Sequence, residues 1–235
     1  MNIVITGAAR GIGKAIASIF AAEGNTIFLC ARNENTLNAT ALELKTNNSS
    51  CTVHSFVADL SSQTEADNFA AFCLAIAIPD ILVNNAGGFV PGNILDEPNG
   101  NLENMIANNL YSAYFITKKL APAMKQNGLG HIFNICSIAA KKAYDGGGSY
   151  SISKFALDGF SQNLRHELMP HGVKVTTVYP GAVFTDSWAG FDNSASRIMD
   201  ADDVAKIILA CTKLSTSAVP EEILLRPQQI GRAHV

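Results

Sequence analysis

A tyrosine and a lysine, Tyr150 and Lys154, stand four residues apart in the sequence. The surrounding pattern predicts a helix that continues through Arg165, and four residues make about one helical turn, so phenol and ammonium share one face. A neighbouring positive charge favours the phenolate and is expected to lower the pKa of the tyrosine. Such a phenol can act as a general acid or base near neutral pH, although the same spacing also occurs as a solvated pair without function.

The elements that would position this pair begin at the amino-terminal end. Residues 2–6 form a short apolar run that leads into three glycines and then into a helical pattern. A strand, a glycine turn and a helix in this order can hold a pyrophosphate, because the N–H groups and dipole at the helix start attract anions. The alternative is a tight turn with a purely structural role. The expected cofactor contacts in this turn are Gly7, Arg10, Gly11, Ile12 and Gly13.

The glycine spacing, Gly-x-x-x-Gly-x-Gly, differs from the common dinucleotide fingerprint and is also close to a P-loop. A P-loop is disfavoured, because the spacing from Gly7 to Gly13 is one residue too long and Ala15 stands where Ser or Thr would hold magnesium. The turn therefore favours dinucleotide binding over phosphoryl transfer.

A second strand, expected over residues 25–30, ends in Ala31 and Arg32. In dinucleotide-binding units an acidic side chain near this point binds the adenosine ribose, whereas an arginine accommodates a phosphate there. Because position 31 supplies no carboxylate, Arg10 and Arg32 together favour NADP(H) over NAD(H). The alternative is that both arginines are ordinary solvated residues.

Strands and helices then alternate, with helices expected over residues 34–46 and 65–77 and strands over 51–57 and 80–84. This alternation predicts a single α/β domain over residues 1–235, a Rossmann-like doubly wound parallel sheet of about seven strands with helices on both faces.

Ligands of such sheets bind at the carboxyl ends of the strands. Asp59 lies at one such end and is expected to accept a hydrogen bond from the adenine amine. Asn85, Ala86 and Gly87 lie at another, where backbone could pass close under a cofactor. Taken alone, these residues would be a cap and a turn.

A long helix is expected over residues 102–126, with Asn108 and Asn109 in its middle. Asparagine is unfavourable inside helices, so one of the two is expected to have a polar role within the protein, while solvent exposure fits Asn108. The next strand, over residues 131–136, places Ser137 at a carboxyl end, where substrates bind, although a serine there can also be a cap.

Composition narrows the class of protein. The 235 residues are 48% hydrophobic and 16% charged, which suits one large buried core, and the net charge of -3 gives no basic surface for nucleic acid. Neither a signal peptide nor an apolar run of about 18 residues is evident, so a cytoplasmic protein without a membrane segment is expected.

Five scattered cysteines contain no C-x-x-C pair, which favours buried free thiols over disulfides or a zinc site. His166 and His171 are five residues apart with Pro170 between them, whereas zinc-binding helices place histidines four apart. No metal site is expected.

In the order and separation of five motifs, the chain resembles the short-chain dehydrogenase/reductase family over nearly its whole length. The motifs are T-G-A-A-R-G-I-G at 6–13, N-N-A-G at 84–87, a serine at 137, Y-S-I-S-K at 150–154 and Y-P-G at 179–181. Any one of them is weak, but the ordered set is specific.

The resemblance implies a catalytic group. Tyr150 would give a proton to a substrate carbonyl that Ser137 polarises, while hydride passes from the reduced nicotinamide to the carbonyl carbon. Lys154 would bind the nicotinamide ribose and lower the pKa of Tyr150. Asn109 would hold a water that links Lys154 to solvent in a proton relay.

The resemblance also implies cofactor contacts near the end of the chain. Pro180, Gly181, Val183 and Thr185 match the family segment beside the nicotinamide carboxamide. Arg10 and Arg32 match positions that bind the 2′-phosphate in NADPH-using members.

The implied function is the NADPH-dependent reduction of a carbonyl compound to an alcohol, or the reverse, on a largely apolar ketone or a 3-oxoacyl thioester. One alternative on the same fold is a non-catalytic NADP-sensing regulatory protein, which loss of the catalytic residues would have favoured, yet Ser137, Tyr150 and Lys154 are all present. A nucleotide-binding interaction module is a third option and would leave these three residues unexplained.

The loop that would cover the substrate and the surfaces that would join subunits can also be predicted. The substrate loop near residues 185–199 is short, which predicts an open pocket and broad substrate acceptance. Its apolar walls would be Phe89, Tyr144, Phe184 and Trp188. Family analogy implies a homodimer or homotetramer that associates through a final strand over 221–226 and the helices near 102 and 149.

Overall fold

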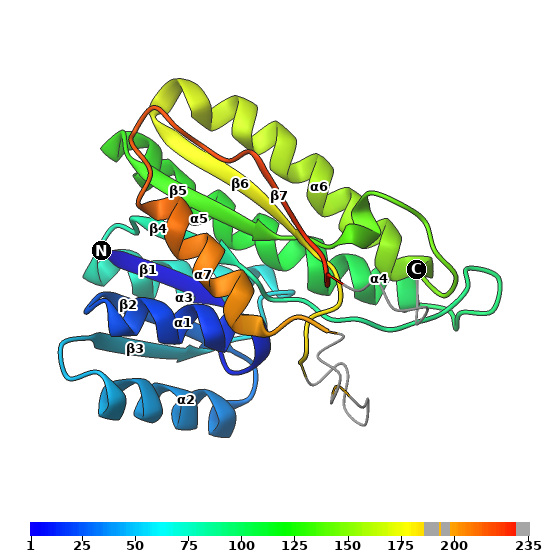
Figure 1. The fold of residues 1–235 in the computed structure, drawn as a ribbon, viewed down its shortest axis with the longest axis horizontal. Helices are drawn as coiled ribbons and strands as arrows, with labels where there is room; N and C mark the ends of the chain where they lie inside the picture. Colours follow the sequence, from blue (N-terminus) through cyan, green and yellow to red (C-terminus); the bar gives the residue numbers. More distant parts are fainter. Residues whose placement is uncertain (186–192, 194–197, 229–235) are drawn as a thin grey trace.

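The structure is a computed structural model that describes residues 1–185, 193 and 198–228 (Figure 1). These residues form one seven-stranded sheet in the order β3-β2-β1-β4-β5-β6-β7, with every neighbouring pair parallel. The strands are β1 (Asn2–Thr6), β2 (Thr26–Ala31), β3 (Thr52–Val57), β4 (Ile81–Asn84), β5 (Gly130–Ile135), β6 (Val173–Pro180) and β7 (Glu222–Leu225). The predicted doubly wound sheet is confirmed.

The α-helices alternate with the strands. They are α1 (Gly11–Ala22), α2 (Glu34–Asn47), α3 (Gln63–Ile76), α4 (Asn101–Ile106), α5 (Ser112–Asn127), α6 (Gly148–Leu168) and α7 (Ala201–Thr212). Short helical turns are η1 (Ala107–Tyr111), η2 (Ile138–Ala140) and η3 (Met169–His171).

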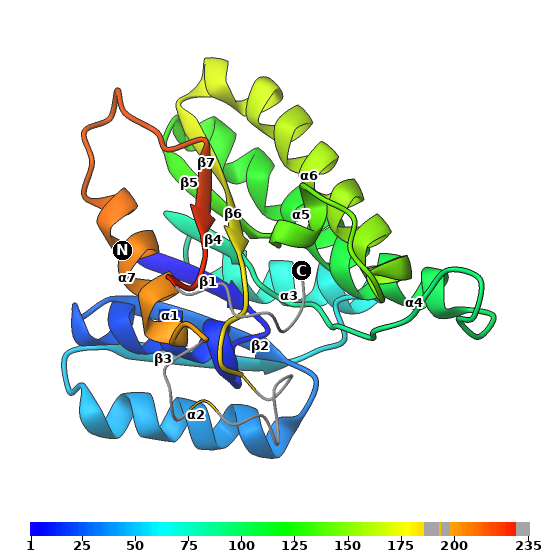
Figure 2. The same cartoon turned by 45° about the vertical axis from the view of Figure 1, so that its right-hand side comes forward.

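Two hydrophobic layers enclose the sheet (Figures 1 and 2). Helices α1, α2 and α7 cover one face, and α3, α5 and α6 cover the other. Along β1 the side chains alternate between them: Ile3 and Ile5 pack with the α1 side, and Val4 packs with the α3 side. A strand that is buried on both faces needs a continuous apolar run, which is why this segment was recognisable from sequence.

The helix predicted over residues 102–126 is interrupted in the structure. Helix α4 ends at Ile106, the π-helical turn η1 follows, and α5 begins at Ser112. A π turn closes its hydrogen bonds over five residues and so carries one residue more than an α turn. Both Asn108 and Asn109 lie in this turn, which resolves the conflict between asparagine and a regular helix interior.

The strand order determines at which edge of the sheet a ligand can bind. From β1 the chain proceeds outward to β2 and β3, and β4 returns to the other side of β1. Ligands of open parallel sheets bind at such a switch point, outside the carboxyl ends of the strands. The carboxyl ends of β1 and β4 are Thr6 and Asn84, immediately before the glycine turn and the Asn85–Gly87 segment.

None of the helices in the described ranges is long and apolar enough to cross a membrane. All five cysteines are free thiols, and four of them are buried, whereas Cys51 is partly exposed.

Candidate active site

The glycine turn and the Asn85–Gly87 segment are joined by hydrogen bonds. The Thr6 hydroxyl accepts from the backbone N–H of Asn85 at 3.0 Å and of Ala86 at 2.9 Å. The Asn85 side-chain amide donates to the carbonyls of Thr6 and Gly7, both at 3.0 Å. These two predicted segments therefore form one unit, at the switch point of the sheet.

The close approach of neighbouring backbone segments explains why glycine stands at positions 7 and 13. Gly7 has a positive φ of 64°, and a Cβ there would lie 2.9 Å from the Cα of Ala86. A Cβ on Gly13 would collide with the carbonyl oxygen of Gly7. Helix α1 begins at Gly11, so the N–H groups of Ile12 and Gly13 belong to its first turn and have no partner within the helix. This helix start can hold a pyrophosphate.

The segment after β6 returns to the same turn. Gly181 donates its N–H to the Leu225 carbonyl at 2.7 Å, which ties the segment to β7. A Cβ on Gly11 would lie 3.1 Å from the Thr185 methyl carbon, so Thr185 borders the glycine turn, and its contact with a cofactor stays a prediction.

The side chain of Val183 is part of the hydrophobic core, and only its backbone can face a cofactor. Val183 forms an isolated bridge with Met199, which joins the two ends of the intervening loop. Most of the predicted substrate loop, including Trp188, lies outside the described residues.

Tyr150 lies in the first turn of α6 and shares a side-chain hydrogen bond with Ser137, two residues beyond the end of β5. Burial raises the pKa of Tyr150, and the Ser137 hydrogen bond lowers it by less. The expectation of a lowered tyrosine pKa is therefore wrong for the polypeptide by itself. Desolvation is the physical reason, because it disfavours the phenolate more than the surrounding groups stabilise it.

Lys154 is buried on the next turn of α6 with 6% of its surface exposed. Its Nζ donates to the Ile135 carbonyl at 3.0 Å and lies 5.9 Å from the centroid of the Tyr150 ring. Burial lowers the pKa of the Lys154 ammonium. An ammonium has three N–H donors, so this one can also bind hydroxyl groups such as those of a ribose.

Asn109 is fully buried and fixes the loop after β4. Its Oδ1 accepts from the Gly88 N–H at 2.8 Å, and its Nδ2 donates to the Gly88 carbonyl at 3.0 Å and to the Ser153 hydroxyl at 2.9 Å. A Cβ on Gly87 would lie 2.6 Å from Asn109 Oδ1 and 3.7 Å from Lys154 Nζ. Asn109, Gly87 and Lys154 therefore meet at one point, and the water-holding role of Asn109 stays a prediction.

Three of the four predicted aromatic walls lie within the described residues, and one of them contacts Tyr150. The Phe89 ring packs edge-on against Tyr150 with centroids 4.8 Å apart, and Phe89 is 42% exposed. A Cβ on Gly147 would lie 3.0 Å from the Tyr144 ring, and Phe184 is 46% exposed. Among the side chains predicted to form apolar walls, Phe89 contacts the Tyr150 ring directly.

Glu97, which no pattern in the sequence indicated, caps the start of α6. Its carboxylate accepts from the Ser149 N–H at 2.8 Å and from the Ser149 hydroxyl. These bonds lower the pKa of Glu97. Gly148 has a φ of +33°, and a Cβ there would overlap Glu97 Oε1, so only glycine fits between them. A glycine-rich segment before a catalytic helix is the signal that could have indicated such a cap.

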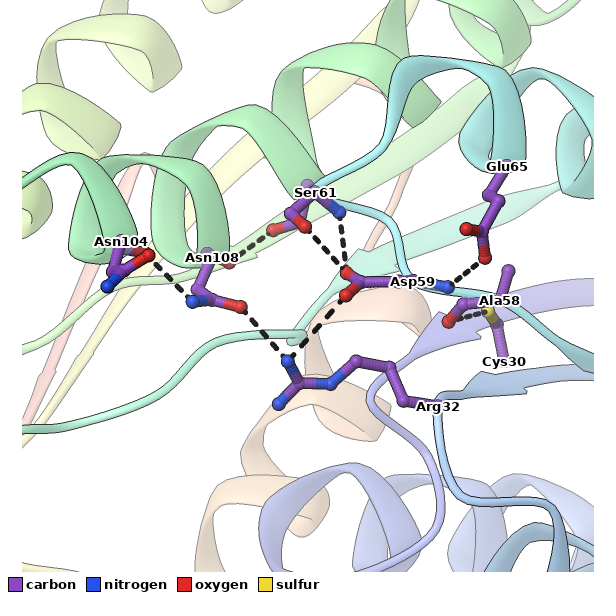
Figure 3. Close-up of polar contacts among 9 residues, drawn as sticks. Cys30, Arg32, Ala58, Asp59, Ser61, Glu65, Asn104 and Asn108 are labelled. Carbon is purple, nitrogen blue, oxygen red and sulfur yellow. Dashed lines mark hydrogen bonds and ion pairs between the residues drawn. The ribbon is translucent and has the colours of Figure 1, made fainter. Parts of the chain in front are cut away.

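At the far end of the binding edge, Arg32 follows β2 and Asp59 follows β3 (Figure 3). Arg32 Nη1 lies 3.8 Å from Asp59 Oδ2 and 3.3 Å from Asn108 Oδ1. Asn108 is half-buried and, in addition to the solvent contact expected from the sequence, has a protein partner in Arg32. Arg10 lies immediately before α1 and is exposed. Its convergence with Arg32 on one phosphate stays a prediction.

A separate cavity of about 370 Å³ lies beyond η2. It is lined by Ile138, Lys141, Lys142, Tyr179, Glu222, Leu224 and Arg226. Lys141 there pairs with Glu222 at 2.8 Å and with Asp158 at 3.7 Å. These contacts tie η2 to α6 and β7.

Within the described ranges no group of His, Cys, Asp and Glu side chains could hold a metal ion.

Comparisons with known proteins agree with this geometry. The family model for short chain dehydrogenase matches residues 1–195. An uncharacterised oxidoreductase of Staphylococcus aureus (strain MW2) is 30% identical over 225 residues, which cover 95% of this chain and 96% of that protein. The sepiapterin reductase of Chlorobaculum tepidum is 30% identical over 234 residues, which cover 96% of this chain and 95% of that protein.

Two solved structures share the whole fold. An alcohol dehydrogenase from the archaeon Thermococcus sibiricus, complexed with 5-hydroxy-NADP, superposes with a TM-score of 0.89 at 27% identity, covering 97% of this chain and 96% of that one. A metagenomic short-chain oxidoreductase in complex with NADP gives a TM-score of 0.84 at 32% identity, covering 97% of each chain. The doubly wound sheet with its site at the β1–β4 switch point defines a dinucleotide-binding oxidoreductase. The chain belongs to the short-chain dehydrogenase family.

Proposed function

We propose that this protein reduces a carbonyl compound to an alcohol with NADPH, or catalyses the reverse reaction, with Tyr150 as the proton donor. One observation carries the proposal. The hydrogen-bonded pair of Ser137 and Tyr150 lies at the carboxyl edge of the sheet, one helical turn from the buried Lys154. Two hydroxyl donors that converge on one place can stabilise the alkoxide that develops from a carbonyl.

The residues present fit a nicotinamide dinucleotide. Gly7, Gly13 and Gly87 let the segments at the switch point pack closely, because a Cβ on any of them would meet protein atoms, and the start of α1 offers N–H groups that have no partner within the helix to a pyrophosphate. When bound, the cofactor supplies or accepts the hydride. Lys154 Nζ would hold the nicotinamide ribose, and Thr185 borders the turn where the pyrophosphate would lie.

The protein's own part in reduction is a proton transfer. Ser137 orients the substrate carbonyl and shares a hydrogen bond with the phenol, which donates its proton as the alcohol forms. The Tyr150 phenol carries its proton at neutral pH and can give it up to the developing alkoxide, although burial, which raises its pKa, makes it a weaker acid than a free phenol. In the oxidative direction the same group must first lose its proton, so that direction is expected to need higher pH.

The substrate class is proposed to be a small to medium, largely apolar ketone or a 3-oxoacyl thioester. The exposed ring of Phe89, which packs against Tyr150, offers apolar contact to such a substrate. Relatives of similar fold include the alcohol dehydrogenase of Thermococcus sibiricus and a 3-oxoacyl-[acyl-carrier protein] reductase of Brucella melitensis. A panel of ketones and 3-oxoacyl esters, followed by NADPH oxidation, would separate these substrates.

Replacing Tyr150 with Phe tests the proposal. We expect turnover to fall by about 100-fold or more, because the proton donor is lost, while NADPH binding changes little. Turnover is measured by NADPH absorbance and binding by titration calorimetry. Retained turnover in Tyr150→Phe would overturn the assigned role. NADPH binding by the wild type without turnover of any carbonyl in the panel would favour an NADP-sensing protein.

The preference for NADP(H) is proposed from Arg32, whose side chain is 62% exposed at the end of β2. We expect Arg32→Ala to raise the KM for NADPH about 10-fold or more and to leave the KM for NADH nearly unchanged, because only NADPH carries the additional phosphate. Steady-state kinetics with both cofactors measure this. An equal effect on both would contradict the preference.

A homodimer or homotetramer is also proposed. Apolar side chains are exposed along neighbouring elements α4, η1, α5 and α6. They are Leu102, Tyr111, Tyr114, Ile152 and Phe155. A contiguous exposed apolar face of this kind favours association.

A further inference from the structure

The guanidinium of Arg32 is held from two directions by residues that are far apart in the sequence (Figure 3). Asp59 approaches from the end of the neighbouring strand β3, because Ala31 and Val57 are paired in register. Asn108 approaches the same nitrogen of the guanidinium from η1 (Figure 3). Both contacts are made through Nη1.

The amide of Asn108 has a fixed orientation. Its Nδ2 donates to the Asn104 carbonyl at 2.8 Å. A carbonyl oxygen can only accept, so the amide nitrogen must face Asn104 and Oδ1 must face Arg32. The Ser112 hydroxyl donates to the Asn108 carbonyl at 2.6 Å and holds the backbone of the turn as well. Asn108 therefore presents a preset acceptor to Arg32.

The contacts leave the rest of the guanidinium available. Because Asn108 and Asp59 both lie against Nη1, the edge formed by Nε and Nη2 can face a ligand, and this planar fork matches two phosphate oxygens. Asp59 is itself held by Ser61, whose N–H and hydroxyl donate to Oδ1 at 3.0 and 2.7 Å. The carboxylate is thus kept in place beside Arg32.

We propose that Asn108 is a positioning residue for cofactor choice: it orients Arg32 so that the free guanidinium edge receives the 2′-phosphate of NADP(H). This inference rests on the proposed preference for NADP(H). A neutral acceptor suits the place, because it restrains the long arginine side chain without adding a second negative charge near the phosphate. An aspartate at position 108 would repel the phosphate, and an apolar residue would release the arginine.

The test uses 2′,5′-ADP and 5′-AMP as probes, since they differ only in the 2′-phosphate and need no turnover. Isothermal titration calorimetry measures both affinities for the wild type, Asn108→Leu and Asn108→Asp. Leucine has a similar shape and no acceptor. Asn127→Leu, at an exposed asparagine that ends α5, is the matched control.

We expect Asn108→Leu to weaken 2′,5′-ADP by about 3- to 5-fold, the range for a mostly exposed contact, and to leave 5′-AMP unchanged. Asn108→Asp is expected to weaken 2′,5′-ADP further. The control should match the wild type. At saturating NADPH the kcat of Asn108→Leu should also match the wild type, because Asn109 and the catalytic group are untouched.

Coupling to Arg32 gives the decisive comparison. If Asn108 acts through Arg32, adding Asn108→Leu to Arg32→Ala should weaken 2′,5′-ADP no further. A further loss in that background, or equal losses for both probes, would overturn the inference and leave Asn108 a structural residue. A wild type that binds both probes equally would overturn the NADP preference first, and this inference with it.

Discussion

Ser137 and Tyr150 share one hydrogen bond. Its effect on the pKa of the Tyr150 phenol is opposite to the effect of burial. Burial raises the pKa of Tyr150, whereas the Ser137 hydrogen bond lowers it. The serine therefore has two roles in the proposed reaction: it contacts the substrate carbonyl, and it limits how far the pKa of the proton donor rises.

Replacing Ser137 with Ala is expected to lower kcat about 100-fold or more, as for loss of an oxyanion donor. Because the removed hydrogen bond lowers the Tyr150 pKa, that pKa should rise in the variant. Alcohol oxidation needs the phenolate. The pH at which the rate of oxidation rises should therefore be higher in the variant than in the wild type. Profiles of kcat/KM against pH measure the shift.

Ser137→Thr keeps a hydroxyl and serves as the control, with a pH profile close to that of the wild type. If the pH profile of alcohol oxidation in Ser137→Ala matched that of the wild type, Tyr150 would not be the titrating base.

At the scale of elements, the position of Tyr150 depends on how α6 begins. The backbone N–H groups at a helix start lack partners within the helix, and here Glu97 supplies an acceptor to Ser149, the residue before Tyr150. Gly92 and Asn93 bind the same region, through the Gly146 carbonyl and N–H respectively, both at 3.0 Å. The loop after β4 and the start of the catalytic helix are therefore one packed unit.

Glu97→Ala is expected to lower kcat severalfold while cofactor affinity is unchanged, since the loss loosens the start of α6 and leaves the glycine turn intact. Stability should depend on pH. The Glu97 pKa is lowered in the folded protein below its ordinary 4.5, so its contribution is present above about pH 4.5 and is lost as pH falls through the folded pKa.

The melting temperature of the wild type should thus exceed that of Glu97→Ala at pH 7, and the difference should shrink at pH values below 4.5. Glu103→Ala, at an exposed glutamate of α4, is the control and should show no such difference. A gap that stays constant with pH would contradict a role for the carboxylate charge.

For the whole molecule, the parallel sheet is covered on both faces, yet the outer surface of α4, η1, α5 and α6 carries several exposed apolar side chains. Helices α5 and α6 already pack together through Tyr114 and Phe160, whose ring centroids are 5.7 Å apart. A second copy that covers this surface would bury the exposed rings of Tyr111 and Phe155.

Phe155→Glu is expected to convert the assembly to smaller species in sedimentation velocity, because the charge would be buried at the contact between copies. Leu42→Glu, at a leucine 67% exposed on α2, should leave the assembly unchanged. A wild type that sediments as a monomer would contradict the proposed oligomer.

The alternation of apolar strands with helices and the glycine spacing were enough to predict the sheet and its binding edge. Each of these signals is local: a buried strand needs a continuous apolar run, and a close turn needs residues without a Cβ. The same holds for Tyr150 and Lys154, since helical spacing alone places them one turn apart. Strand β6 was the least evident, known beforehand only from its final Y-P-G motif.

Other properties depended on contacts between residues distant in sequence. Asn108 meets Arg32 across 76 positions, and Glu97 meets Ser149 across 52, so neither contact leaves a periodic signal. The direction of the Tyr150 pKa was mispredicted because burial, which only the packed fold defines, is the largest cause of its shift. The sequence by itself determined which groups are present and which share an element. The tertiary structure decided their solvation and their partners, because both depend on how separate elements pack.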